Sequence, residues 1–361
     1  MFSSERVREG HLRGHFDRVE TWPGRTLRRR KTGPELRSSS SAAFYLTSRS
    51  FARIPAVRAY LRLVRFPLVF TAVADSLAGY LVGRRRGVDT IDPLVVSLLV
   101  VVSATLYMVG MAANDIADRH RDRLLHPDRV LPSGALTPAQ AWICVLLLLA
   151  ASGVALSILS LRAPMAPEAI GIGRVGIWFA MVGMILLYDF GGKVFALGGP
   201  ILMGLIRASN FLLGLVYTPT TLEFDKGLAL FAGVSFIYVM CLTLVSTLEE
   251  GPPRRGLFVI AAGGMLAAAM GAGAIGWLIV WTFYAPGVAV SIVLVGWLVV
   301  RIVDAWRVLV RKRIMNLVRD GVMAIILLDA SVVLWSGRAL EGAVVGGLLL
   351  PAVVFLHAFR R

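Results

Sequence analysis

Four polar residues follow a long apolar stretch in the first third of the chain: Asn114, Asp115, Asp118 and Asp122. On a helix, Asn114, Asp118 and Asp122 stand four residues apart, so their side chains drift by about 80° in total and form one polar stripe. Carboxylates that share a stripe at a membrane boundary repel one another unless a cation lies among them. Mg²⁺ suits this position, because it takes a few carboxylate oxygens and completes its shell with water and phosphate. The stripe therefore predicts a Mg²⁺ site formed by Asn114, Asp118 and Asp122.

Basic residues crowd the loop that follows the stripe. One guanidinium group can donate two parallel hydrogen bonds to phosphate oxygens, so this loop has the donors to bind a diphosphate beside the metal. The spacing alone leaves an alternative open, because Asp and Arg are also ordinary residues of a solvated, charged cytoplasmic loop. The basic residues are Arg119, Arg121, Arg123 and Arg129.

The composition limits the class of protein. Of the 361 residues, 57% are apolar and 17% are charged, and the apolar residues fall in long runs, which indicates an integral membrane protein. The formal net charge of +16 is concentrated at the amino terminus and in residues 301–319. In a membrane protein this indicates cytoplasmic loops against anionic membrane lipid, and not binding of nucleic acid. Cys144 and Cys241 lie inside apolar runs and are expected to be small core residues.

The chain divides by composition into two parts. Residues 1–58 are rich in Arg and Ser and have no apolar segment of the kind found in a cleavable secretory signal. We expect them to form a disordered cytoplasmic arm, with an organellar transit peptide or a wrongly assigned start codon as alternatives. Residues 59–361 form the predicted transmembrane domain.

Apolar runs separated by Pro, Gly and charged clusters predict nine or ten membrane-spanning helices, and no alternating barrel pattern is present. The fold class predicted is therefore an all-α polytopic membrane bundle. The predicted spans are 66–82, 93–113, 138–161, 170–188, 195–217, 228–248, 257–281, 286–300, 321–335 and, as a tenth, 343–359.

The distribution of basic residues predicts the topology. The loops after the second, fourth, sixth and eighth spans share one side with the amino terminus and contain Arg119 to Arg129, Lys193, Arg254 and the segment 301–319. We therefore expect an inner-membrane protein with a cytoplasmic amino terminus and cytoplasmic catalytic loops. The basic segment 84–86 on the opposite side departs from this rule.

The motif of Asn114, Asp115, Asp118 and Asp122 resembles the first aspartate-rich motif of the UbiA superfamily of intramembrane prenyltransferases. The resemblance extends from about residue 61 to residue 335. It implies a Mg²⁺-dependent transfer of an isoprenyl group from a prenyl diphosphate to a lipophilic or aromatic acceptor. It also implies catalytic roles for Asp115, Asp118 and Asp122. The segment after the motif also resembles the family, at Arg129, Pro132, Ser133 and Gly134.

A second group of polar residues lies near the fifth span. Arg207 and Asn210 are neighbours on one helix face inside an apolar run, where an unpaired charge costs about 3 kcal/mol. Arg207 therefore needs a partner, which is either an acid such as Asp75 or a bound diphosphate. The family has a Tyr and a Lys after its fourth helix, which implies that Lys193 is catalytic and binds diphosphate together with Arg207 and Asn210.

The chain departs from the family at its second aspartate-rich motif, between the sixth and seventh spans. The positions that should hold Asp are Leu248 and Pro252, and Glu249 and Glu250 are adjacent, so on a helix they point about 100° apart. A second metal held by two aspartates is therefore doubtful, and we expect Arg254 to supply part of the missing positive charge. This pattern resembles the divergent EboC-type branch.

Two classes of function remain open. The first is a prenyltransferase, in which an allylic diphosphate ionises and an acceptor captures the carbocation. The second is a non-catalytic or transport-type membrane protein derived from this fold, which the degraded second motif favours. A CDP-alcohol phosphotransferase is not expected, because its Asp-Gly-x-x-Ala-Arg stretch is absent from the sequence.

Overall fold

The computed structural model describes residues 56–84, 90–162, 168–192, 195, 197–218, 226–249, 254–280 and 284–360. All of them belong to one compact unit, Ala52–Arg361. The predicted amino-terminal arm lies outside the described residues except for its last three positions, and Lys193 lies outside them as well.

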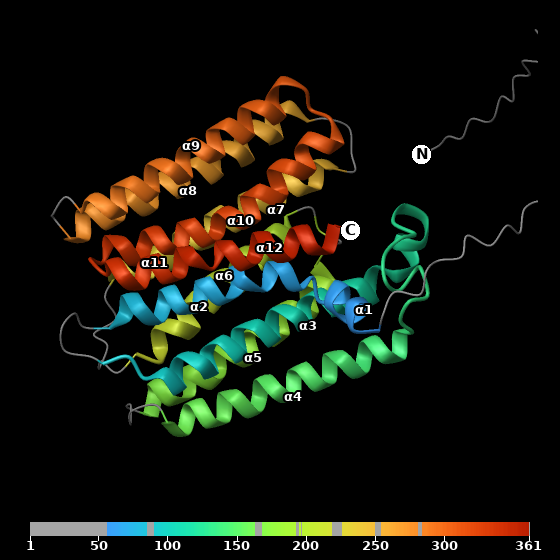
Figure 1. Cartoon of the computed structure of the whole chain (residues 1–361), viewed down its shortest axis with the longest axis horizontal. Coiled ribbons are helices and arrows are strands. Elements are labelled where there is room, and N and C mark those ends of the chain that lie inside the picture. Colours follow the sequence, from blue (N-terminus) through green and yellow to red (C-terminus); the bar gives the residue numbers. More distant parts are fainter. Residues whose placement is uncertain are drawn as a thin grey trace, which may run out of the picture. The chain divides into compact units, whose positions relative to one another are not determined.

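The described part of the chain is helical and contains no strand, which confirms the predicted all-α bundle (Figure 1). Nine segments of it are long and apolar enough to cross a membrane. The elements are α1 (Ala56–Leu63), η1 (Phe66–Leu68), α2 (Val69–Gly83), α3 (Pro93–Leu125), α4 (Pro138–Arg162), α5 (Glu168–Phe190), α6 (Gly198–Val216), α7 (Lys226–Ser246), η3 (Thr247–Glu249), α8 (Arg255–Val280), α9 (Ala285–Arg307), α10 (Arg311–Trp335), α11 (Ala339–Gly347) and α12 (Leu349–Arg360).

Helix α10 differs from the span predicted at 321–335, because it begins ten residues earlier, at Arg311. It is not among the nine segments, since Arg319, Asp320 and Asp329 lower its apolar character. It is nevertheless buried at nearly every position from Gly321 to Trp335 and packs against α2, α7, α8 and α9. Neighbouring helices and not lipid surround α10, so it tolerates charges that a lipid-facing span would exclude.

Helix α2 lies at the centre of the bundle, in contact with α3, α6 and α10 (Figure 1). Its contact with α6 depends on two glycines. A Cβ at Gly79 would lie 1.9 Å from the carbonyl oxygen of Phe211, and a Cβ at Gly214 would lie 1.9 Å from that of Ser76. Small residues let the backbones of membrane helices approach this closely and gain van der Waals contact. The backbones of α2 and α6 are therefore in direct contact at these two positions.

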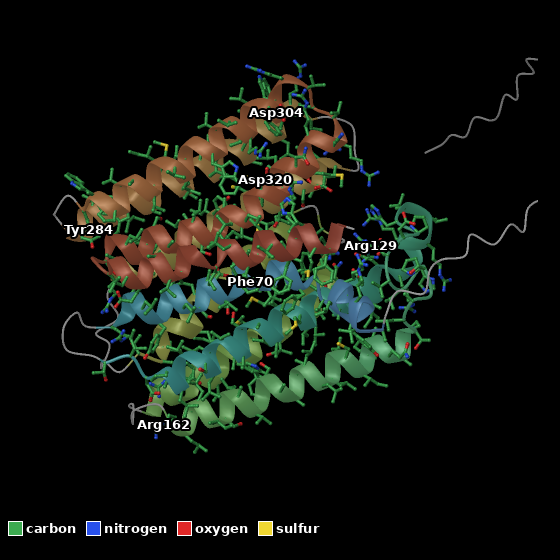
Figure 2. All side chains as sticks on the ribbon, in the orientation of Figure 1. Phe70, Arg129, Arg162, Tyr284, Asp304 and Asp320 are labelled. Atoms are coloured by element: carbon green, nitrogen blue, oxygen red, sulfur yellow. The ribbon has the colours of Figure 1, made fainter. Side chains whose placement is uncertain are left out.

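The helix ends gather at two opposite ends of the bundle. Arg129 and Asp304 lie toward one end, and Arg162 and Tyr284 lie toward the other (Figure 2). The end of α3 that carries the aspartates lies with the ends of α5 and α7 and the start of α6, whose residues line one cavity. The ends of α3, α5 and α7, which precede three of the loops predicted on one side, therefore lie at one end of the bundle.

Candidate active site

The polar stripe lies at the end of α3, the longest described helix. Asp92 caps the start of this helix by accepting hydrogen bonds from the backbone nitrogens of Leu94 (2.9 Å) and Val95 (3.4 Å). The 33 residues of α3 extend about 50 Å, whereas the hydrocarbon core of a bilayer is about 30 Å thick. The last turns of α3 therefore extend to the membrane boundary, where its polar residues can meet a charged ligand.

The structure brings Asn114, Asp118 and Asp122 to one wall of a single cavity of about 440 Å³. Their spacing by four residues places them on one helix face, as predicted. The cavity thus has a carboxylate-rich wall and, around it, basic, aromatic and hydroxyl side chains. The other lining residues are Arg65, Met111, Arg121, His126, Arg129, Tyr188, Met203, Ser246, Thr247 and Glu249.

The second loop reaches the same cavity. After α7 ends at Ser246, the chain continues as the short 3-10 turn η3, which directs Glu249 toward the cavity and buries Leu248. Glu249 therefore takes part in the site although Leu248 replaces the expected Asp. Glu250 and Pro252 lie outside the described residues.

Two arginines neutralise two of the acids. Arg129 pairs with Asp122 (2.5 Å between Nη1 and Oδ2) and lies 3.8 Å from Asp115, while Arg65 pairs with Asp115 at 3.3 Å. Asp115 is buried and does not line the cavity. The structure thus places Asp115 behind the cavity wall, where it holds Arg65 and Arg129 beside the site.

The loop after α3 holds Arg129 in place. Val130 and Leu131 are buried and anchor the loop, and the backbone nitrogen of Ala135 donates to the carbonyl of Val130 at 3.1 Å. Gly134 has a φ of +74°, a left-handed conformation that glycine adopts without steric cost. The Pro-Ser-Gly segment therefore forms a turn after Arg129, and the chain turns back toward Asp122 at His126, whose carbonyl accepts from the backbone nitrogen of Arg129 at 3.0 Å.

Two basic residues of the cavity, Arg65 and His126, were not predicted from the sequence. Arg65 precedes the first span and has a left-handed backbone (φ 46°, ψ 50°), which is uncommon for a residue other than glycine. Burial lowers the pKa of Arg65, but the charge of Asp115, the charge of Tyr107 and the hydrogen bond to Asp115 together raise it above its ordinary value. Burial and the charge of Arg129 lower the pKa of His126, so this imidazole is neutral at pH 7. An arginine directly before the first apolar run was the available signal for Arg65.

Other predicted diphosphate ligands lie elsewhere. Arg254 is exposed just before α8 and does not line the cavity. Arg207 and Asn210 are buried deeper, on α6, where Arg207 pairs with Asp75 at 2.8 Å. The acid that the sequence offered as an alternative partner of Arg207 is thus its partner in the structure. Lys193 lies outside the described residues.

A second cavity lies next to the first, within the bundle. It measures about 60 Å³, is bounded by α2, α3, α5 and α6, and shares Met111, Tyr188 and Met203 with the polar cavity. Its lining is mostly apolar, and Arg207 and Asn210 form part of its wall. A ligand with a charged head and an apolar tail would match the two cavities together.

The donors around the polar cavity fit Mg²⁺. Among the described residues, no three His, Cys, Asp or Glu side chains cluster closely enough to form a protein-only metal cage. Mg²⁺ does not need one, because proteins usually bind it through one or two carboxylates while water and substrate phosphates fill the remaining positions. Asp118, Asp122 and the amide of Asn114 supply such a partial set of oxygens.

Similarity to known proteins was found at the level of three-dimensional structure. No family model and no curated protein matches the sequence. A digeranylgeranylglyceryl phosphate synthase superposes with a TM-score of 0.55 and 18% identity, over 78% of this chain and 99% of the synthase. A UbiA homologue from Aeropyrum pernix K1 superposes with a TM-score of 0.52 and 17% identity, over 74% of this chain and 96% of the homologue.

A UbiA homologue from Archaeoglobus fulgidus bound to GPP and Mg²⁺ superposes with a TM-score of 0.50 and 13% identity, over 76% of this chain and 99% of the homologue. Nearly the whole length of each of these structures is covered. The chain is thus a polytopic membrane protein with a polar cavity at one end of its helical bundle. Its fold is the one found in these UbiA homologues.

Proposed function

We propose that this protein is a Mg²⁺-dependent intramembrane prenyltransferase, which moves an isoprenyl group from a prenyl diphosphate to a lipophilic or aromatic acceptor. One observation carries the proposal. The cavity that holds Asn114, Asp118 and Asp122 also holds Arg65 and Arg129, and it shares part of its wall with an apolar cavity within the bundle. The two cavities match the charged head and the apolar tail of an allylic diphosphate.

Different parts of the site would contact the diphosphate and the allylic chain. Asn114, Asp118 and Asp122 would hold Mg²⁺, which when bound supplies positive charge against the departing diphosphate. Arg65 and Arg129 donate hydrogen bonds to diphosphate oxygens, and Lys193 remains a proposed third donor. The apolar cavity holds the allylic chain and keeps water from the carbocation, so the acceptor captures it.

The structural neighbours support the class of donor. One was determined with GPP and Mg²⁺, and another is a synthase of digeranylgeranylglyceryl phosphate. The degraded second motif remains the basis for proposing the EboC-type branch. The basic loops support an inner-membrane location with this end of the bundle in the cytoplasm.

One observation favours the rival, a non-catalytic or transport-type protein. Asp122 and Asp115 are already neutralised by Arg129 and Arg65, so the acids do not need a metal for electrostatic balance. The two functions differ in whether a prenyl diphosphate is consumed.

The experiment is binding of radiolabelled GPP to the detergent-purified protein across a Mg²⁺ titration, followed by measurement of diphosphate release. We expect Mg²⁺-dependent binding that Asp118→Asn weakens by tenfold or more, because the substitution removes a charged metal ligand. Asp128→Asn is the matched control, since Asp128 is exposed in the same region and does not line the cavity. A GPP affinity that does not depend on Mg²⁺ and that neither substitution changes contradicts the proposal. Binding of GPP without release of diphosphate, in the presence of membrane lipid extract, favours the non-catalytic or transport-type protein.

A further inference from the structure

Two apolar helices meet the membrane boundary at basic residues that do not line either cavity. Helix α8 begins at Arg255 and α9 ends at Arg307, and both helices are long and apolar enough to cross a membrane. Helix α10 begins at Arg311, directly after the short connection 308–310. Asp304 marks this end of α9 in Figure 2, toward the same end of the bundle as Arg129. Cations therefore lie where these three helices reach the level of the lipid head groups.

Trp306 joins the start of α8 to the end of α9. The guanidinium of Arg255 lies over its ring, 5.7 Å from the ring centre, and Phe258 stacks on it with 6.0 Å between ring centres. Arg313 closes the turn from α9 to α10, because its Nη1 donates to the carbonyl and to the carboxylate of Asp304, each at 2.8 Å. These contacts hold residues of three helices in one surface, which we call the basic patch. Its residues, all exposed, are Arg254, Arg255, Trp306, Arg307, Arg311 and Lys312.

The acids near the basic patch are already bound by other arginines. Asp304 pairs with Arg313 at 2.8 Å. Asp320 pairs with Arg301 at 2.8 Å and with Arg319 at 2.7 Å. Among the described residues, no acid forms an ion pair with a member of the basic patch. The patch is therefore complementary in charge to an anionic surface.

Exposed apolar side chains flank the basic patch at Val303, Val308, Val310 and Met315. Tryptophan gathers at the membrane–water interface, and long basic side chains extend from that level toward the head groups. A soluble phosphate or an acidic protein would not need this apolar margin. Cations around an exposed tryptophan match a phospholipid, because its phosphate and its acyl chains belong to one molecule.

We propose that the basic patch binds the head group of an anionic phospholipid, with Arg307 and Lys312 donating to its phosphate and Trp306 contacting its acyl chains. The patch lies near the polar cavity. Burial and the charge of Arg129 lower the pKa of His126, a cavity residue, and the charge of Arg311 acts in the same direction. The start of α10 is therefore within electrostatic reach of the cavity. The inference does not rest on the proposed function, because lipid binding needs neither Mg²⁺ nor a prenyl diphosphate.

The test reconstitutes the full chain in phosphatidylcholine vesicles that also contain phosphatidylglycerol or phosphatidylcholine with the same dibrominated acyl chains. Bromine quenches a tryptophan that it touches, and the difference between the wild-type chain and Trp306→Phe isolates the signal of Trp306. Quenching across a series of mole fractions gives the relative association constants of the two lipids. We expect phosphatidylglycerol to bind at Trp306 at least about fivefold more tightly, because one basic residue at an anionic surface contributes about this factor.

Three variants locate the interaction. Arg307→Gln combined with Lys312→Gln removes two charges of the basic patch and should lower the preference for phosphatidylglycerol to about twofold or less. Arg307→Lys combined with Lys312→Arg keeps both charges and should keep the preference. Arg123→Gln is the matched control and should also keep it, because Arg123 is exposed in the last turn of α3 and lies outside the patch.

Equal association constants of the two lipids at Trp306 in the wild-type chain overturn the inference and leave the patch to a soluble acidic partner. A preference that the double glutamine variant keeps overturns it as well. An equal loss in Arg123→Gln does the same, because the preference then reflects the net charge of the whole chain. Inorganic phosphate that abolishes the preference at constant ionic strength refutes the assignment to a lipid. Failure of GPP binding leaves these results unchanged, so the two proposals fail separately.

Discussion

The proposed function has Arg129 and Mg²⁺ compete for the carboxylate of Asp122, so removing this arginine should change two affinities in opposite directions. In Arg129→Gln, Asp122 loses its partner at 2.5 Å and becomes available to the metal, while the diphosphate loses a donor. A hydrogen bond to a charged group contributes about 1.5–3 kcal/mol. The side chain of Arg129 is 32% exposed, so we discount this to about 1 kcal/mol for solvent screening.

An effect of about 1 kcal/mol predicts that Mg²⁺ alone binds Arg129→Gln roughly fivefold more tightly than it binds the wild-type chain, whereas GPP in the presence of Mg²⁺ binds more weakly. Isothermal titration calorimetry of the detergent-purified protein measures both affinities. Arg123→Gln is the control, because Arg123 is exposed in the last turn of α3, close to Asp122, and does not line the cavity. An equal or weaker Mg²⁺ affinity in Arg129→Gln, relative to Arg123→Gln, would refute the assignment of Asp122 as a metal ligand.

Three further predictions concern the second loop, the topology and the amino-terminal arm. Asp118→Asn should weaken GPP binding far more than Glu249→Gln, because Asp118 has Asn114 and Asp122 one turn to either side; equal losses would show that the second loop also holds metal. A cysteine at position 125, where the native leucine is 48% exposed, should react with an impermeant maleimide from the cytoplasmic side only, and labelling from outside alone would reverse the topology. A chain that begins near residue 54 should insert and bind GPP as the full chain does, because the arm has no apolar periodicity to offset the entropy of ordering; normal insertion with no GPP binding would assign the arm a function.

The sequence predicted the bundle well because each span has to satisfy the same lipid environment along its whole length. Helix α10 was predicted less accurately, since it is enclosed by protein and its charged residues obscure its start at Arg311. Runs of apolar residues report exposure to lipid, and a helix in the interior of the bundle does not need them.

The candidate site was predictable where it depends on one helix and not where it depends on tertiary contacts. The spacing of Asn114, Asp118 and Asp122 determines their common face on α3. Arg65 reaches the site only through a left-handed backbone turn, and Glu249 only through the short turn η3. Neither turn has a period that a sequence pattern can reveal, so Arg65 was missed and Glu249 was undervalued.

The backbone contact between α2 and α6 limits where the bundle can open. At Gly79 and Gly214 the two helices touch without intervening side chains, so they cannot slide past each other or separate without losing that contact. Between α3 and α5 the contact is looser, because a Cβ at Gly110 would lie 3.6 Å from Cγ2 of Ile185, an ordinary van der Waals distance. The α2–α6 contact thus resists movement more than the α3–α5 contact does. Breathing motions of the bundle should therefore occur more readily between α3 and α5 than between α2 and α6.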